Sequence, residues 1–386
     1  MRIQDIQKIS LIGAGDMGHG IAEVALLAGY SVCMRDINKE LVERGVKRLT
    51  DSLQKLLNKN KVSREQYDRI TTDLLSTTVS LEEAVKEAEL VIEAVPEIFD
   101  LKKEVFKDID RFSPENAILA TNTSTMSITE ISLATKRPKK VLGLHFFNPV
   151  VMMKLVEVIK GDHTSDETME VAYSFCTRIG KIPVRVEKDI PGFIVNRVQA
   201  PSGALYGAIV DHGIAQPEEI DALMRKLGKP MGPFELLDFT GIDVSYNARN
   251  YFSQAISPDL GPFRFMKDKV KAGEYGKKTG RGFYDWSKGR PEIDISKATQ
   301  KVDPKDILAV QINEATKLIE WGVATAEDID KAIVNGTGNE KGPMEEAQQF
   351  ESDDLVKRLE RLSKEFDKKI FEPTKMIREG RYLKET

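Results

Sequence analysis

Short apolar segments alternate with helical patterns along the first half of this 386-residue chain. The apolar segments predict buried strands at residues 9–12, 32–34, 90–94, 117–120, 141–144 and 155–159. Helical patterns such as residues 18–28 and 100–110 lie between them. This alternation is typical of βαβ units, in which helices cover a parallel sheet. We therefore expect an α/β domain over residues 1–188, with a charged helical hairpin inserted at residues 38–72.

The second half of the chain reads as helical, and it contains an internal repeat. Three segments recur in the same order and at nearly the same spacing: residues 213–221 as 322–330, residues 232–233 as 342–343, and residues 270–279 as 377–386. The repeat predicts an all-α region of two copies, at residues 189–290 and 300–386. Two readings of the duplication stay open: the second copy enlarges the core, or the pair reproduces within one chain the contact of a two-fold dimer.

Composition excludes several classes of protein. Lys and Arg number 57 against 61 Asp and Glu, a net charge of -4 that offers no general attraction to nucleic acid or anionic lipid. The two cysteines, Cys33 and Cys176, lack metal-site spacing and fit a reducing compartment. The first residues lack an apolar secretion signal. We expect a cytoplasmic protein with no nucleic-acid or membrane partner and no metal; whether it self-associates stays open.

A glycine-rich turn, Gly13-Ala14-Gly15-Asp16-Met17-Gly18, follows the first predicted strand and opens the first predicted helix. Glycines at this spacing allow a tight turn, backbone approach to a pyrophosphate and close helix packing, as in Rossmann-type domains. Asp36 ends the second predicted strand, where a carboxylate accepts ribose hydroxyls and repels a 2′-phosphate. The pattern predicts NAD as cofactor, although Arg35 is placed to relax the preference over NADP.

His145 stands at the end of the apolar strand that begins at Val141, at the sheet edge where ligands bind. Glu157 interrupts another apolar strand, where a carboxylate without a partner is costly to bury. A His145–Glu157 pair resolves this problem. Such a pair is a general acid–base device, and beside a nicotinamide it predicts alcohol oxidation.

Two polar runs point to the same edge. Residues 121–125, which include Asn122 and Ser124, directly follow the strand at residues 117–120; they are also suited to capping a helix at 127–131. Asn196 lies in the first predicted helix after the domain boundary. We expect this helix to face the substrate cleft.

Together these segments resemble the 3-hydroxyacyl-CoA dehydrogenase family. The resemblance covers residues 5–286 and rests on the glycine loop and on residues 120–124 (ATNTS), 143–149 (GLHFFNP), 154–159 (KLVEVI), 191–197 (PGFIVNR), 230–238 (PMGPFELLD) and 276–284 (GKKTGRGFY). The repeated helical unit is similar to the longer members of the family.

The resemblance implies a role for each matching residue. His145 is the catalytic base with Glu157 as its partner, and Ser124 and Asn196 hydrogen-bond the substrate's 3-oxygen. The implied cofactor residues are Gly13, Gly15, Asp16, Met17, Gly18, Asp36, Glu97, Lys102 and Asn122. The implied coenzyme A contacts are Ser52 and Lys59 on the helical hairpin, although Lys55 and Lys61 are equally well placed.

The resemblance therefore implies an NAD-dependent (S)-3-hydroxyacyl-CoA dehydrogenase acting on an acyl-CoA thioester, with 3-hydroxybutyryl-CoA and acetoacetyl-CoA as the preferred pair. We expect one active site in the chain and no hydratase activity. Two alternatives remain. One is a dehydrogenase of a hydroxy acid without coenzyme A, and the other is a non-catalytic NAD-binding protein.

Overall fold

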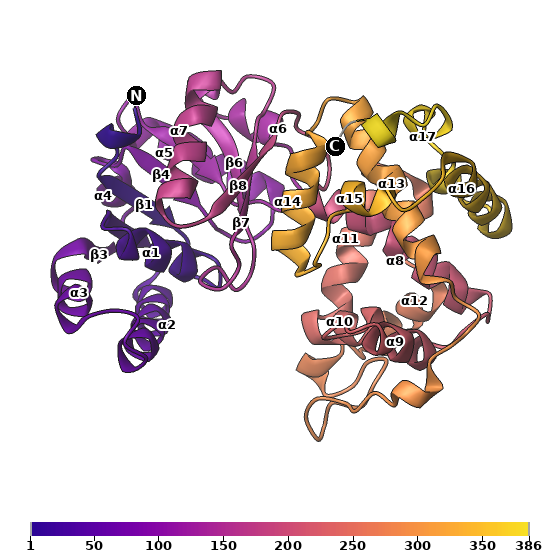
Figure 1. Ribbon diagram of the computed structural model, residues 1–386. Helices are drawn as coiled ribbons and strands as arrows, with labels where there is room; N and C mark the ends of the chain where they lie inside the picture. Colours follow the sequence, from indigo (N-terminus) through magenta and orange to yellow (C-terminus); the bar gives the residue numbers. More distant parts are fainter. Residues whose placement is uncertain (1, 385–386) are drawn as a thin grey trace. The chain divides into compact units, whose positions relative to one another are not determined.

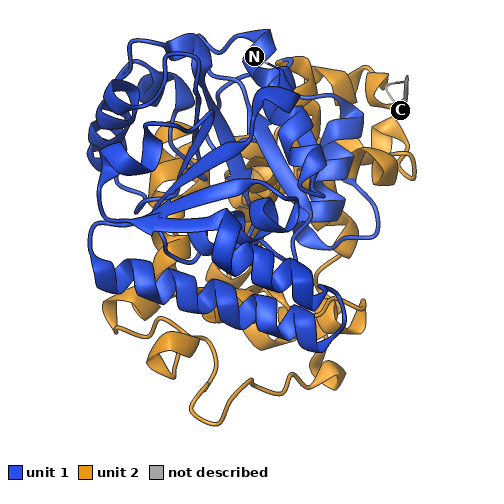
Figure 2. Ribbon diagram, turned by 90° about the vertical axis from the view of Figure 1, so that its left-hand side faces the viewer, with its two compact units in different colours: residues 1–194, 322–342 blue, residues 195–321, 343–386 orange. Residues whose placement is uncertain are grey.

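The computed structural model describes residues 2–384 of the chain. These residues form two compact units (Figure 2). The first unit runs to Ile194 and takes in Gly322–Gly342; the second comprises Val195–Trp321 and the residues from Pro343 onward. The second predicted helical copy is thus divided between the units, because part of it packs against the sheet. The limits of the three predicted domains stay predictions.

An eight-stranded sheet forms the centre of the first unit (Figure 1). Its strands are β1 (Lys8–Ile12), β2 (Ser31–Arg35), β3 (Leu75–Thr78), β4 (Leu90–Glu93), β5 (Ile118–Thr121), β6 (Val141–Phe146), β7 (Leu155–Ile159) and β8 (Ile182–Val186). Their order in the sheet is β3-β2-β1-β4-β5-β6-β7-β8. All six predicted strands are present, and β3 and β8 are additional. The order reverses direction between β1 and β4, which is the switch point where such sheets bind ligands.

The prediction of a parallel sheet is wrong at one place. Strands β1 to β6 pair in parallel, but β7 runs antiparallel to β6. A parallel connection needs a crossover of a dozen or more residues, and residues 147–154 between β6 and β7 are too few to form one. Strand β8 then pairs in parallel with β7 after a helical crossover.

Helices cover both faces of the sheet, as the sequence predicts. They are α1 (Gly18–Leu27), α2 (Lys39–Asn58), α3 (Arg64–Arg69), α4 (Leu81–Val85), α5 (Phe99–Phe112), α6 (Ile128–Ser132), α7 (Asp166–Arg178) and α14 (Ala326–Thr337). One core packs α1 and α7 on the sheet, and a second core packs α4, α5 and α6. The helix α14 contacts β7 and β8. The helices α2 and α3 contact one another beside α1 (Figure 1).

The second unit is helical. It contains α8 (Val195–Asp211), α9 (Pro217–Lys226), α10 (Pro233–Thr240), α11 (Ile242–Ala255), α12 (Arg264–Lys271), α13 (Pro304–Glu320), α15 (Pro343–Ala347), α16 (Ser352–Phe366) and α17 (Lys375–Arg378). Within residues 2–384, no helix is both long enough and apolar enough for a bilayer span.

The repeat is visible in the local packing. Gly232 approaches Asp221 so closely that a Cβ atom would overlap the carboxylate, and Gly342 approaches Asp330 in the same way. The Asp221 carboxylate accepts the backbone N–H groups of Phe234 and Glu235, at 2.9 and 2.7 Å. Both copies therefore keep a glycine where an acidic side chain lies beside the start of the next helix.

A carboxylate is fully buried in the middle of α1. Glu23 Oε1 accepts a 2.7 Å hydrogen bond from the Ser52 hydroxyl, whereas Oε2 has no hydrogen-bond partner among the described residues. Burial raises the pKa of Glu23 to about 7, above its ordinary value of 4.5. The folded protein therefore holds this proton more tightly than the unfolded chain does.

The raised pKa predicts a specific pH dependence of stability. Between about pH 4.5 and 7 the folded state binds more protons than the unfolded state, so the free energy of unfolding falls as pH rises through this window. We expect Glu23→Gln to remove this loss. At pH 8 the free energy of unfolding of the variant should exceed that of the wild type by as much as about 3 kcal/mol. Urea unfolding of both proteins from pH 4 to pH 8 measures this difference in the free energy of unfolding. Glu43→Gln, on an exposed face of α2, is the control, and a Glu23→Gln curve parallel to the wild-type curve would contradict the argument.

Candidate active site

Four polar side chains lie on one face of the sheet near the carboxyl ends of its parallel strands. Side chains alternate between the faces of a strand. In β6, Leu142, Leu144 and Phe146 enter the core under α1 and α7, so His145 points to the opposite face. The same alternation places Glu93 in β4, Thr121 in β5 and Glu157 in β7 on that face.

The predicted His145–Glu157 pair is present. The antiparallel register of β6 and β7 sets these two residues directly opposite one another. His145 Nδ1 lies 2.6 Å from Glu157 Oε2, and both residues are buried. Glu157 Oε1 accepts the backbone N–H of Ile194 at 3.0 Å. Because the carboxylate receives the Nδ1 proton, Nε2 is the ring nitrogen left to accept a proton.

Aromatic rings and a backbone contact fix the histidine. The His145 ring lies 4.4 Å from the Phe147 ring and 5.9 Å from the Phe193 ring, measured between centroids. Asn122 Oδ1 accepts the backbone N–H of Phe146 at 2.9 Å. The amide of Asn122 thus ties the end of β5 to the end of β6, next to His145. This contact does not test the predicted role of Asn122 at the cofactor.

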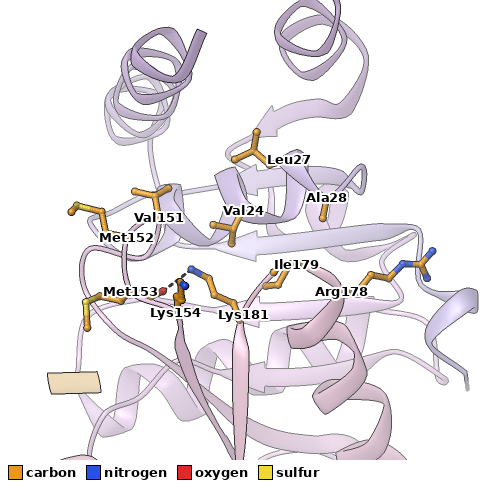
Figure 3. A pocket seen from close by; sticks show the side chains of 11 residues that line it. Val24, Leu27, Ala28, Val151, Met152, Met153, Lys154, Arg178, Ile179 and Lys181 are labelled. Atoms are coloured by element: carbon orange, nitrogen blue, oxygen red, sulfur yellow. Dashed lines mark hydrogen bonds between the residues drawn. The ribbon is translucent and has the colours of Figure 1, made fainter. Parts of the chain in front are cut away.

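The loop between the two paired strands is held by a buried lysine. Lys181 Nζ donates hydrogen bonds to the carbonyl of Val150 and, at 2.8 Å, to that of Met153. Figure 3 shows this side chain pointing from the start of β8 toward the loop. Burial lowers the pKa of Lys181 to about 8. A cavity of about 420 Å³ lies beside the loop, with Lys154 and Arg178 among its lining residues (Figure 3).

The three glycines of the predicted nucleotide loop meet different surroundings. A Cβ atom on Gly13 would overlap the backbone of Ala94, and one on Gly18 would overlap the carbonyl of Gly13. A Cβ on Gly15 would meet nothing within 4 Å. The first and third glycines are therefore required by packing, and the second borders open space. Met17, the N-cap residue of α1, makes no side-chain capping bond. Its side chain therefore does not occupy the first backbone N–H groups of the helix, which are the groups that bind a pyrophosphate in such loops.

The acidic residues near this loop are held differently. Asp36 Oδ2 accepts the backbone N–H of Ala14 at 2.8 Å, which places its carboxylate beside the glycine loop as a ribose contact requires. Asp16 instead forms an ion pair with Arg48 of α2. Arg35 Nε donates to the carbonyl of Val79 at 3.1 Å. The Asp36 position fits NAD.

A buried ion-pair network lies at the ends of β4 and β5. Lys102 of α5 is buried, and its Nζ lies 2.7 Å from Glu93 Oε1 and 3.2 Å from Glu97 Oε2. Glu93 Oε2 accepts the Thr121 hydroxyl at 2.7 Å. Glu93 was not among the predicted site residues, because it falls within the apolar segment at residues 90–94 that was predicted as a buried strand. The signal that identified Glu157, a carboxylate in such a strand, was present here as well.

The Glu97 side chain connects this network to Ser124. Glu97 Oε1 accepts the Thr123 hydroxyl at 2.5 Å and the backbone N–H of Ser124 at 2.9 Å. Burial alone would raise the pKa of Glu97, but the charge of Lys102 and these hydrogen bonds outweigh it, so the pKa lies below its ordinary value. The Glu97 carboxylate is therefore held ionised within the Ser124 loop.

Helix capping does not explain the polar run at residues 121–125. Ser127 caps α6, since its hydroxyl accepts the backbone N–H of Glu130 at 3.2 Å. Residues 121–125 instead make the contacts with Glu93 and Glu97 described above.

The remaining predicted residues lie elsewhere in the fold. Asn196 is in the first turn of α8, in the second unit. The Ser52 hydroxyl contacts Glu23, and Lys59 is exposed at the end of α2, as are Lys55 and Lys61 nearby. The structure therefore brings together His145 and Glu157, and Glu97, Lys102 and Ser124. Within residues 2–384, no group of three or more His, Cys, Asp or Glu side chains is arranged to hold a metal ion.

The network predicts a large effect of Lys102→Met on stability. The substitution leaves Glu93 fully buried without its cation, so we expect the free energy of unfolding to fall by about 3–5 kcal/mol. Lys107→Met, on the exposed face of the same helix, is the control and should change it by no more than about 0.5 kcal/mol. Urea denaturation at pH 7 measures both, and equal small changes would show that the network contributes little.

Comparison with known proteins identifies the family. Residues 8–190 match the NAD binding domain of 3-hydroxyacyl-CoA dehydrogenase, and residues 192–286 and 305–385 match its C-terminal domain. A probable 3-hydroxybutyryl-CoA dehydrogenase of Bacillus subtilis is 43% identical over 287 residues, which cover 73% of this chain and 98% of the relative. The mitochondrial hydroxyacyl-coenzyme A dehydrogenase of Mus musculus is 40% identical over 288 residues, which cover 73% of this chain and 91% of the relative.

A solved structure extends the likeness over both helical copies. The crystal structure of 3-hydroxybutyryl-CoA dehydrogenase from Escherichia coli has a TM-score of 0.88 and 30% sequence identity, and the match covers 98% of this chain and 99% of that one. The chain belongs to the 3-hydroxyacyl-CoA dehydrogenase family.

Proposed function

We propose that this protein oxidises the 3-hydroxyl group of a 3-hydroxyacyl-CoA thioester with NAD and catalyses the reverse reduction. The buried 2.6 Å contact between His145 and Glu157 carries the proposal, because it joins a proton acceptor to a fixed negative charge. The preferred pair is (S)-3-hydroxybutyryl-CoA and acetoacetyl-CoA, which the names of the relatives support.

The residues that would hold NAD are the glycine loop, the start of α1 and Asp36. Strand β6 lies three positions from β1 in the sheet, a separation of about 14 Å between strand axes, which is within the reach of a dinucleotide. When bound, NAD supplies the hydride acceptor. The chain's own residues supply proton transfer and orientation.

The proton is taken by His145. Nε2 accepts the proton of the 3-hydroxyl group, and the imidazolium that forms is stabilised by Glu157 through Nδ1. Ser124 and Asn196 hydrogen-bond the 3-oxygen and hold it for this transfer. The Glu97 carboxylate, held by Lys102, fixes the backbone of Ser124. In the reverse direction the imidazolium returns the proton, so lower pH favours ketone reduction.

The two helical copies form, we propose, an internal pseudo-dimer. The helices α8 and α13, which are equivalent in the repeat, pack against one another. The equivalent short helices Pro258–Leu260 and Lys369–Phe371 also contact each other. Contacts between equivalent elements are expected around a two-fold axis. A cytoplasmic location is proposed as well, because Cys33 and Cys176 are both free thiols.

Replacing the proposed base tests the mechanism. We expect His145→Gln to lower kcat for oxidation of (S)-3-hydroxybutyryl-CoA by about 10²–10⁴-fold, because a glutamine side chain cannot act as a general base. His163→Gln, at an exposed loop position, is the matched control and should keep nearly full activity. Activity of His145→Gln close to that of the wild type would refute the assignment.

Replacing Asp36 tests the choice of cofactor. We expect Asp36→Ala to weaken NADH binding more than NADPH binding, because the carboxylate both receives the ribose hydroxyls and repels a 2′-phosphate. Asp36→Asn keeps an oxygen for the Ala14 N–H and removes only the charge. Fluorescence titration with both nucleotides measures the change. Equal losses for NADH and NADPH would mean that the ribose contact is misassigned.

A further inference from the structure

A cavity of about 690 Å³ lies within the helical unit, and none of the residues assigned to the reaction is among those that line it. It is bounded by α8, α11, α12, the short helix Pro258–Leu260 and the end of α16. Phe263 and Phe366 line it, together with Arg249 and Lys368. Its volume is that of a pocket for a small organic ligand.

Arg249 lacks the acidic partner that Arg197 and Arg137, two other arginines shielded from solvent, have. Arg197 pairs with Glu314 at 2.5 Å, and Arg137 pairs with Asp110 at 2.6 Å. Within residues 2–384, no hydrogen bond or ion pair is formed by the Arg249 guanidinium, whose nearest aromatic contact is the ring of Phe263 at 5.5 Å. Burial lowers the pKa of Arg249 to about 10, and no carboxylate counters this effect.

A glycine on α8 leaves room for the Arg249 side chain. Gly203 of α8 lies so close to the guanidinium that a Cβ atom at this position would overlap Nη2. The glycine therefore leaves room for the cation on the wall of the cavity. A charge placed in such a position without a partner is unfavourable unless a ligand completes the site.

Two acidic side chains of the cavity, Asp211 and Asp259, already accept hydrogen bonds from backbone N–H groups, and Asp268 is the third acidic residue in the lining. Asp211 accepts the backbone N–H of Arg264 at 2.7 Å, and Asp259 Oδ2 accepts that of Ile370 at 2.9 Å. Lys368 Nζ donates to the backbone carbonyl of Asp259 at 2.9 Å. Burial, together with the charge of Arg249, lowers the pKa of Lys368 below its ordinary value although Asp259 and Asp211 raise it. Arg249 and Lys368 thus line one cavity and lie close enough for the charge of Arg249 to lower the pKa of Lys368.

We propose that this cavity binds a small phosphate ester, with the phosphate group held by Arg249 and Lys368 and an attached ring held between Phe263 and Phe366. A phosphate dianion matches two cations and accepts hydrogen bonds from both of them. The cavity far exceeds the size of a free phosphate, and its aromatic walls suit a ring.

Titration calorimetry on the full chain with phenyl phosphate and with inorganic phosphate tests the proposal. Saturating NADH is present throughout, so that the cofactor site is filled. We expect phenyl phosphate to bind with one site per chain and more tightly than inorganic phosphate. Arg249→Met should weaken binding about tenfold or more, and Arg44→Met, on the exposed face of α2, should leave it unchanged.

A second variant guards against misfolding of the first. Lys368→Gln keeps Arg249 in place, and we expect it to weaken phenyl phosphate binding severalfold. Arg249→Met should unfold at a temperature no lower than that of the wild type without ligand, because it removes a half-buried charge without a partner. The proposal is overturned if the wild type binds neither probe, if inorganic phosphate binds as tightly as phenyl phosphate, or if both variants bind like the wild type.

Discussion

The antiparallel pairing of β6 and β7 is the constraint on which the site depends. It sets His145 opposite Glu157 on one face of the sheet, where alternation of side chains makes both point the same way. The short connection between β6 and β7 allows only an antiparallel pairing, and this pairing produces the direct opposition of the two side chains. Lys181 reinforces the arrangement by holding the carbonyls of Val150 and Met153 in that connection.

Two buried carboxylates in the site are each stabilised by a partner on a neighbouring element. Glu93 and Glu157 are fully buried carboxylates in otherwise apolar strands, and each has a partner on a neighbouring element. The partner of Glu157 is a histidine, the side chain most often used as a general acid or base, whereas the partner of Glu93 is a lysine that forms an ion pair with it. The first pair therefore suits proton transfer, and the second suits a fixed support for the Ser124 loop.

Patterns local in the sequence predicted much of this arrangement. The six apolar strands, the glycine loop and the pairing of His145 with Glu157 all rest on periodicity or on the need to satisfy a buried charge. The contact of Ser52 with Glu23 depends on how α2 packs on α1, which the spacing of residues does not encode. The packing of α14 on β7 and β8 is likewise a tertiary choice. Glu93 was within reach of the same reasoning that found Glu157.

The central claim is that the His145 site acts on a coenzyme A thioester with NAD. Absorbance at 340 nm, with NADH and acetoacetyl-CoA and then with NADPH or free acetoacetate, tests it most directly. We expect rapid loss of NADH with the thioester and little change in absorbance in the other two mixtures. Loss of NADH with a free keto acid but not with the thioester would keep the NAD site and contradict the coenzyme A assignment, and no loss with any substrate would contradict catalysis itself.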